Sequence, residues 1–483
     1  MGRLLPGALA TLRCKLRRVP VLVILATSTA ALRAQTLTPI LANGPASNRV
    51  NLVVLSEGYT SGQLGQFLVD ATSLVDRLLE TPPYDEYRSY FNAWAIAVAS
   101  AESGSDHPGT GGPYRNTYFN SAYEFYNYVI TIPPNGLDSN PAHGQAKVDA
   151  LITNLAPQAN LVVLLVNDPA PGGSAVLGGP GGTSARRPII TALNPQFPYS
   201  DIAAHESGHL FAGLVDEYTS AYPGYVPVEA PNATRQTNRS SIRWEAWIEP
   251  TTPVPTPNDF GYADVVGLFE GAQYQTTGWY RPKLDCKMQT LGTPFCEICS
   301  EQIVKTIYQV VRPTDGFDPP VSPLVLRSAQ PVQFAVTPQS PRSHNLSIQW
   351  FTNGVPVGGV TETTVQLEPR VLGNGTHSVQ VVVADETSLV RYDPAGLLRA
   401  TNSWTVTVSL TELAMTAVRF LPDGRFRFTI TGTAPNNLVI EASPDLNRWT
   451  RLSTNTLVNG RLDYTNAAGD GIQLRFYRAL SPP

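Results

Sequence analysis

The residues with the clearest chemical potential are the five from His205 to His209, which read His-Glu-Ser-Gly-His. On a helix, residues four apart lie on one face, so His205 and His209 can offer two imidazole nitrogens to one metal ion. Glu206 lies beside them and is placed to take a proton from a water molecule at that metal. The alternative is a surface helix with two solvated histidines. The chain has only six histidines in 483 residues, so this motif is improbable by chance. The motif therefore favours a zinc site.

A catalytic zinc site needs a third protein ligand, with the fourth position left for water. Gly213 is suited to end the helix, because glycine readily adopts the left-handed conformation found at helix C-termini. The chain can then turn back and bring Asp216 to the metal. Glu217 is an alternative ligand, or a hydrogen-bond acceptor that orients a ligand histidine. Further alternatives for the third ligand are Glu229, His107 and His143.

The spacing of these residues resembles the metzincin pattern H-E-x-x-H-x-x-G-x-x-H/D, with the glycine and the acid each one residue later. Met288 strengthens the resemblance, since no other methionine occurs between Met1 and Met415. Metzincins place a methionine-containing turn beneath the zinc. We therefore expect Met288 to lie under the metal ligands.

A longer stretch, from about Asn48 to Arg312, resembles the IgA-peptidase family of secreted bacterial zinc metallopeptidases. The longest matching string is His205–Tyr218, H-E-x-G-H-x-F-A-G-L-x-D-E-Y. Shorter matches are Glu57–Thr60, Tyr90–Asn92, Glu102–Asp106, Asn167 with Gly172-Gly173, Phe269–Ala272, Tyr280–Pro282, Cys286–Met288, Phe295-Cys296 and Cys299. The resemblance implies that His205, His209 and Asp216 bind zinc and that Glu206 is catalytic. Glu57 departs from the family, which more often has aspartate there.

Peptide hydrolysis also needs a donor for the developing oxyanion. Tyr280 and Arg281, which precede the methionine turn, are candidate donors, and Tyr280 is the predicted catalytic residue. Tyr218 and Tyr274 are the alternatives.

Residues 1–34 have the features of a signal peptide. Basic residues up to Arg18 precede an apolar core at Val21–Ala26 that is too short to span a bilayer. We expect cleavage before Gln35 and a secreted protein.

Removal of the signal peptide leaves three cysteines, Cys286, Cys296 and Cys299. No histidine lies near them in sequence to complete a structural zinc site. In an oxidising compartment we expect one disulfide, either Cys286–Cys296 or Cys286–Cys299, with one thiol left over.

Composition limits the partners. A net charge of −4 gives no electrostatic reason to bind nucleic acid or anionic membranes. No long apolar segment follows the signal peptide, so we expect no membrane span. With 38 glycines and 42 prolines, the chain should be rich in loops and β structure.

The expected fold is multidomain, with an α/β metzincin-like zinc peptidase domain over residues 35–312 and two all-β domains after it. Val50–Leu55 and Asn160–Val166 have the apolar pattern of buried strands, and Gln63–Leu79 has helical spacing. Pro171–Gly182 is glycine-rich and is expected to form a loop near the cleft.

Residues 313–323 form a proline-rich stretch that we interpret as a linker. Residues 324–410 are predicted to be an Ig-like β-sandwich, in which Ser347–Gly354 supplies a strand with the core tryptophan Trp350. Residues 411–483 are predicted to be a small β domain. Neither β module carries catalytic residues, so they are interpreted as spacers or as units that contact a surface or carbohydrate.

The sequence thus predicts a secreted zinc-dependent endopeptidase that cleaves extracellular proteins. One alternative is a surface adhesin with a vestigial zinc site, against which the intact Glu206 argues, since a relic needs no general base. A second alternative is a zinc hydrolase of a non-peptide bond.

Overall fold

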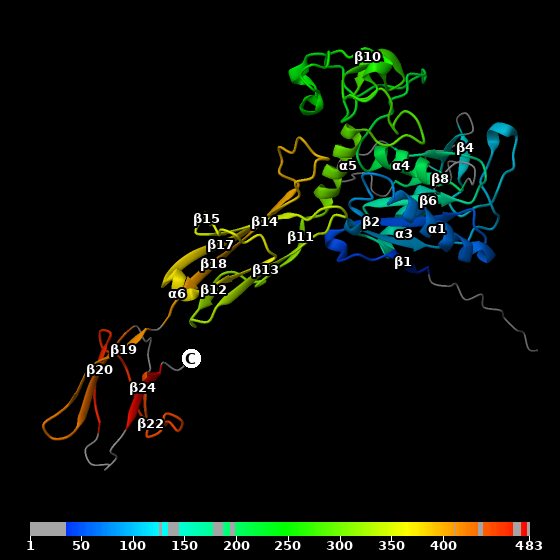
Figure 1. The fold of residues 1–483 in the computed structure, drawn as a ribbon. Coiled ribbons are helices and arrows are strands. Elements are labelled where there is room, and N and C mark those ends of the chain that lie inside the picture. Colours follow the sequence, from blue (N-terminus) through cyan, green and yellow to red (C-terminus); the bar gives the residue numbers. More distant parts are fainter. Residues whose placement is uncertain are drawn as a thin grey trace, which may run out of the picture. The chain divides into compact units, whose positions relative to one another are not determined.

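The computed structural model of the chain describes residues 35–124, 128–133, 144–176, 187–193, 199–410, 412–432, 438–466 and 475–480 (Figure 1). The predicted signal peptide, residues 1–34, lies outside these ranges, as does His143.

A six-stranded mixed sheet forms the centre of the N-terminal region. Its strand order is β1-β3-β2-β6-β8-β7, with the four inner strands parallel and the two edge strands antiparallel to their neighbours. The strands are β1 (Leu37–Leu41), β2 (Val50–Glu57), β3 (Phe91–Ile96), β6 (Leu161–Val166), β7 (Gly173–Ser174) and β8 (Ile189–Ala192).

Helices cover both faces of this sheet (Figure 1). They are α1 (Leu64–Leu78), α3 (Gln145–Leu155), α4 (Tyr199–Leu210) and α5 (Glu297–Val310). Alternate residues of β2 point to opposite faces: Leu52 and Val54 join the core with α1, α4 and α5, whereas Val53 joins the core with α3. Both faces are therefore buried, which explains the continuous apolar runs of β2 and β6. The predicted strands and helix in this region are confirmed.

Two hairpins lie outside the large sheet. They are β4 (Ala122–Glu124) with β5 (Val129–Thr131), and β9 (Phe269–Ala272) with β10 (Gln275–Arg281). The second hairpin turns at Gln273 and Tyr274, both of which have positive φ.

The next region consists of two facing β-sheets. One has the order β11-β13-β16 and the other β12-β18-β17-β14-β15. Their strands are β11 (Thr314–Asp318), β12 (Leu324–Leu326), β13 (Val332–Pro338), β14 (Ser347–Thr352), β15 (Val355–Pro356), β16 (Thr364–Leu367), β17 (Gly375–Ala384) and β18 (Arg399–Val408), with the short helix α6 (Pro369–Leu372). Trp350 is fully buried and stacks on Trp404, with ring centroids 6.0 Å apart, as a sandwich core requires. Strand β11 falls inside the segment interpreted as a linker, because it pairs with β13.

The C-terminal region has two three-stranded sheets, β19-β20-β23 and β22-β21-β24. Their strands are β19 (Leu413–Phe420), β20 (Phe426–Gly432), β21 (Leu438–Ser443), β22 (Thr450–Asn455), β23 (Arg461–Thr465) and β24 (Phe476–Leu480). A small core of Phe428, Ile430, Leu438 and Ile440 joins them.

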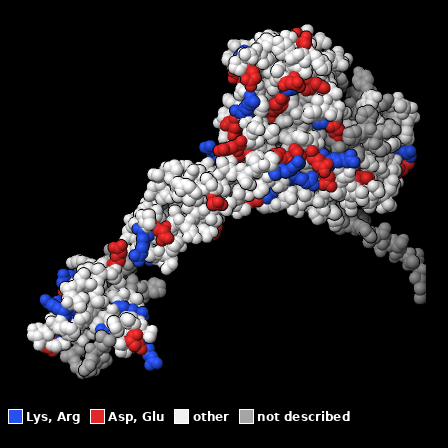
Figure 2. Space-filling model, viewed as in Figure 1, with Lys and Arg blue, Asp and Glu red and all other residues white. Residues whose placement is uncertain are grey.

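The predicted multidomain architecture with sandwich-like β-sheets is confirmed. Within the described ranges, no helix is both long and apolar enough to cross a bilayer. On the face shown in Figure 2, the acidic and basic side chains of the described residues are interspersed, in keeping with a chain of which only 15% is charged.

Candidate active site

Helix α4 carries the His-Glu-Ser-Gly-His motif on its last two turns. Asp201 in its first turn complements the helix dipole and also accepts a hydrogen bond from the ammonium group of Lys287. Gly213 ends the helix with a φ of +67°, and its amide donates to the carbonyl of His209 at 3.1 Å. The predicted glycine turn is therefore present, and it directs the chain back toward the helix.

This turn brings Asp216 onto the two histidines. Asp216 Oδ1 lies 3.2 Å from His205 Nε2 and 3.3 Å from His209 Nε2, and the two Nε2 atoms are 3.2 Å apart. Ligands at about 2.0–2.1 Å from a tetrahedral zinc ion lie about 3.3 Å from one another. The three atoms thus have the mutual spacing of ligands to one metal ion.

The hydrogen bonds on the far side of each ring leave Nε2 free for a metal. His205 Nδ1 donates to the carbonyl of Lys287 at 2.9 Å, and His209 Nδ1 donates to that of Leu214 at 2.8 Å. Each Nε2 then presents a lone pair, and Asp216 Oδ1 is buried without a hydrogen-bond donor among the described residues. With both imidazoles neutral, three acceptors face one another at this distance, an arrangement that a bound cation would stabilise.

The pKa shifts of His209 and Asp216 also indicate a site that favours positive charge. Burial disfavours a charge on His209, but the carboxylate of Asp216 outweighs this effect and raises the pKa of His209 to about 9. Burial also raises the pKa of Asp216, but the two histidines outweigh it and hold that pKa well below its usual range. The site therefore attracts positive charge, as a binding site for a divalent cation must.

Met288 packs directly beneath the motif. A Cβ on Gly208 would lie 2.7 Å from Met288 Sδ, so the glycine allows the sulfur to approach the helix backbone. The carbonyl of Met288 also accepts a hydrogen bond from the amide of Glu217 at 2.9 Å, next to Asp216. Met288 therefore packs against the helix that carries the two histidines, as expected.

Glu206 faces a cavity of about 710 Å³ together with the three converging residues. Desolvation raises the pKa of Glu206, while the two histidines oppose this shift. Its carboxylate lies next to the edge strand β7, since Oε1 is 3.6 Å from where a Cβ of Gly173 would be. Five tyrosines also line this cavity: Tyr128, Tyr218, Tyr222, Tyr225 and Tyr274.

A comparison with known families decides what this site belongs to. A family model described as IgA Peptidase M64 matches residues 38–261 and 258–307, which together exceed half of the chain. The chain belongs to the IgA peptidase M64 family. M64 membership makes the chain a peptidase, whose substrate is protein or peptide, and implies a metal cofactor.

Other comparisons add little to the M64 assignment. The sequence has no significant match among curated proteins. Fibronectin(III)-like modules of Clostridium thermocellum CbhA match 32% of this chain and 80% of theirs, at 12% identity and a TM-score of 0.16. A quinonprotein alcohol dehydrogenase-like protein from Bacteroides thetaiotaomicron matches 23% of this chain and 22% of its own, at 14% identity and a TM-score of 0.15. Scores this low support no statement about fold or function.

The residues that compete with Asp216 in this M64 chain lie in other surroundings. Glu229 accepts a hydrogen bond from the amide of Arg235 at 2.8 Å. His107 Nε2 is 3.0 Å from Asp168 Oδ2 and stacks on Tyr123. Glu217 is fully buried beside the cysteines. Of the described candidates, only Asp216 lies with the two histidines.

Tyr280 is not among the described residues that line the cavity. Its side chain interacts with Glu270, and its amide donates to the carbonyl of Thr234. Tyr274 instead hydrogen-bonds a candidate ligand, because its hydroxyl donates to Asp216 Oδ2. Tyr274 and Asp216 are 58 residues apart in the sequence, so sequence spacing does not indicate this contact. The sequence therefore supports Tyr274 only as an alternative donor. The loop expected at Pro171–Gly182 reaches the cavity through Pro171 to Ala175, while residues 177–182 lie outside the described ranges.

The disulfide expected in this family member is not present. Cys286, Cys296 and Cys299 are all buried free thiols, and the Sγ atoms of Cys286 and Cys299 are 3.7 Å apart. That distance is far longer than the about 2.05 Å of a sulfur–sulfur bond. Glu217, which is remote from the cysteines in sequence, lies with the three sulfurs.

Proposed function

We propose that this chain is a secreted zinc-dependent endopeptidase with a metzincin-like site. His205, His209 and Asp216 hold the metal, and Glu206 is the general base. The observation that carries the proposal is the convergence of three acceptor atoms to within 3.3 Å on the wall of a large cavity.

The donor set favours zinc. Two imidazole nitrogens and one carboxylate oxygen are borderline ligands that suit Zn²⁺ better than Ca²⁺ or Mg²⁺, which prefer oxygen. Three protein ligands leave a fourth position open, as in catalytic rather than structural sites. Held by these three residues, zinc would supply a Lewis acid able to polarise the scissile carbonyl and to lower the pKa of a water molecule to about 7.

Glu206 accepts the proton of that water molecule and passes it to the leaving amine. Its adjacency to His205 in α4 places it beside the ligands without making it one of them. Tyr218 is the donor that we assign to the developing oxyanion in place of Tyr280. Its ring stacks on His205 with centroids 6.0 Å apart, and burial raises the pKa of its hydroxyl, which therefore stays protonated.

We assign the substrate backbone to the edge strand β7. This strand is the last in the sheet order, and both of its residues line the cavity beside Glu206. An extended peptide can add to such an edge through main-chain hydrogen bonds. This mode of binding favours endopeptidase action on extended segments of proteins.

Secretion is part of the proposal and rests on residues 1–34 alone. Their basic segment and short apolar core fit an export signal that is removed from the mature protein.

Metal removal tests the proposal directly. We expect a chelator to abolish cleavage of an unfolded protein such as casein by the mature protein, and one equivalent of Zn²⁺ per active site to restore it. Cleavage is measured by the release of fluorescent peptides, and the metal by mass spectrometry of the dialysed protein. Full activity in protein freed of metal would contradict the mechanism. Recovery of activity with Mg²⁺ but not with Zn²⁺ would show that magnesium, not zinc, is the cofactor.

Tyr274→Phe tests the support of the third ligand. Because the variant removes the hydrogen bond to Asp216 Oδ2, we expect zinc affinity to fall by about 10–100-fold. Competition with a chromogenic chelator measures this affinity. Tyr225→Phe is the matched control, since the Tyr225 ring lies 4.7 Å from that of Tyr274 but its hydroxyl donates to Gln273. Equal affinities in the two variants would remove Tyr274 from the site.

A further inference from the structure

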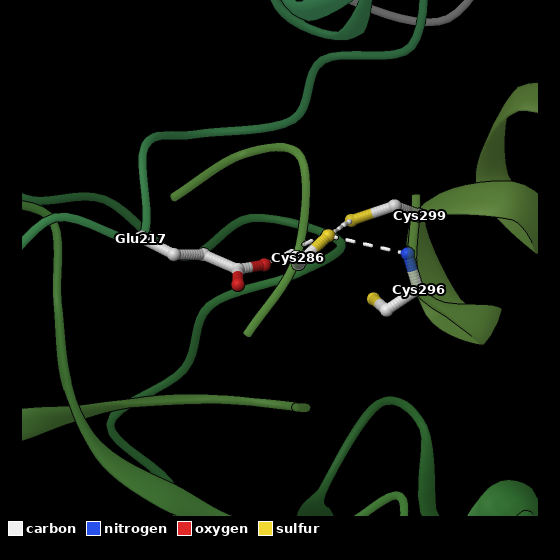
Figure 3. A group of neighbouring side chains, drawn as sticks. All are labelled: Glu217, Cys286, Cys296 and Cys299. Carbon is white, nitrogen blue, oxygen red and sulfur yellow. Dashed lines mark hydrogen bonds between the residues drawn. The ribbon is translucent and has the colours of Figure 1, made fainter. Parts of the chain in front are cut away.

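A second cluster of metal-ligating side chains lies apart from the candidate active site. Glu217, Cys286, Cys296 and Cys299 are all buried, and their ligand atoms lie within 4.8 Å of one another. Figure 3 shows the carboxylate and the three sulfurs pointing into one small space. Cys296 and Cys299 come from the start of α5, Cys286 from the methionine turn, and Glu217 from the residue after Asp216.

The distances in this cluster match a tetrahedral thiolate site. Cys286 Sγ lies 3.7 Å from Cys299 Sγ, and Cys299 Sγ lies 3.8 Å from Glu217 Oε1. Sulfur atoms bound at about 2.3 Å to one tetrahedral zinc ion are about 3.8 Å apart. The amide of Cys296 donates to Cys286 Sγ at 3.2 Å, a contact that stabilises a thiolate.

The protein alone leaves this cluster incomplete. Glu217 Oε1 accepts from Asn232 Nδ2 at 2.9 Å, but Oε2 is buried with no hydrogen-bond partner among the described residues. The positive charge of Arg281 acts on Glu217. The Arg281 guanidinium, however, donates its hydrogen bonds to the carbonyls of Glu270, Gly271 and Leu284. A buried carboxylate oxygen without a partner is costly, and a bound cation removes that cost.

We propose that Glu217, Cys286, Cys296 and Cys299 form a second metal site, which holds a structural Zn²⁺ ion. Three soft thiolates select zinc over the hard cations. Four protein ligands close the coordination sphere, and the burial of all four excludes substrate, so the ion is structural. Binding releases to solvent the protons that the three thiols and Glu217 carry in the metal-free protein, and Arg281 offsets part of the remaining negative charge.

The position of this site gives it a role. Glu217 is bonded to Asp216, and Cys286 is separated from Met288 by one residue, Lys287, whose carbonyl accepts from His205. One ion would therefore tie together the segment that carries the third candidate ligand and the turn beneath the histidines. We expect its loss to loosen both and to lower the thermal midpoint of unfolding.

Metal content in ligand variants tests the second site. The mature protein should contain two zinc ions per chain, and the His205→Ala/His209→Ala double variant should retain one. Cys296→Ser should also lose one ion, whereas Glu297→Gln should keep two, because Glu297 lies in the same helical turn but pairs with Lys283. A double-histidine variant without zinc would overturn the second site.

A cysteine variant could lose zinc only because it fails to fold. Spectroscopy and thiol counting test the second site without such a variant. Cobalt in the double-histidine variant should give intense thiolate-to-metal charge-transfer absorption, and its absence would contradict ligation by sulfur. The denatured, unreduced protein should give three thiols on titration. A single thiol would overturn the proposal in favour of a disulfide. Three thiols without a second zinc ion would also overturn it. These readouts do not use peptidase activity, so failure of the catalytic mechanism is seen separately.

Discussion

Glu206→Gln is expected to lower kcat for peptide hydrolysis by about 10²–10⁴-fold, the usual contribution of a general acid–base residue. The amide has the shape of the carboxylate but cannot accept a proton. Zinc content should stay unchanged, because the three converging atoms come from His205, His209 and Asp216. KM should also change little, since the variant keeps the shape of the cavity wall. Steady-state kinetics on a fluorogenic peptide and metal analysis of the same preparation measure both quantities.

Glu245→Gln provides the control for the loss of a carboxylate, because Glu245 is exposed on the surface. We expect this variant to keep wild-type kcat. A Glu206→Gln enzyme with normal kcat would contradict the assigned base and leave only the metal in the mechanism. Loss of zinc together with activity would instead indicate that Glu206 supports the ligands.

Local geometry explains what the sequence predicts well about this site. The relation of His205, Glu206 and His209 depends only on the helical repeat, and Gly213 has the positive φ that favours glycine. Asp216 follows within the same turn, so its position also depends on nearby residues. The buried strands β2 and β6 are predictable for a similar reason, because a sheet covered on both faces needs continuous apolar runs.

Tertiary contacts explain what the sequence does not predict. Glu217 and Cys299 meet across 82 residues, and neither the spacing of the cysteines nor the nearby residue types indicates this partner. Sequence neighbours alone therefore predict a disulfide, although Glu217, from the segment after α4, lies with the three cysteines. Tyr274 contacts Asp216 because it lies in a hairpin turn with a positive φ. Tyrosine rarely adopts this conformation, so its presence in the sequence does not predict the turn. Proline-rich composition predicts a linker at residues 313–323, whereas strand β11 forms there through its pairing with β13, a contact distant in sequence.

Asp216→Ala is expected to abolish stoichiometric zinc binding at the catalytic site and with it peptide hydrolysis. The variant removes both the third donor atom and the negative charge that attracts a cation between the histidines. Affinity should fall by more than the about 10–100-fold that the loss of an outer hydrogen-bond partner costs. Zinc titration with a competing chelator measures the affinity, and kcat is measured at saturating zinc.

Glu229→Ala separates this assignment from the alternative in which Glu229 is the third ligand. Glu229 lies twenty residues after His209 in the sequence, but it bonds to the amide of Arg235 and approaches Arg243 rather than the histidines. We expect the Glu229→Ala protein to bind zinc and cleave peptides like the wild type. If it loses zinc while Asp216→Ala retains it, the third ligand is Glu229, and the turn at Gly213 then only closes the helix. If both variants retain zinc, the two histidines hold the metal with a ligand from elsewhere, and the convergence at Asp216 Oδ1 reflects a proton shared with His209.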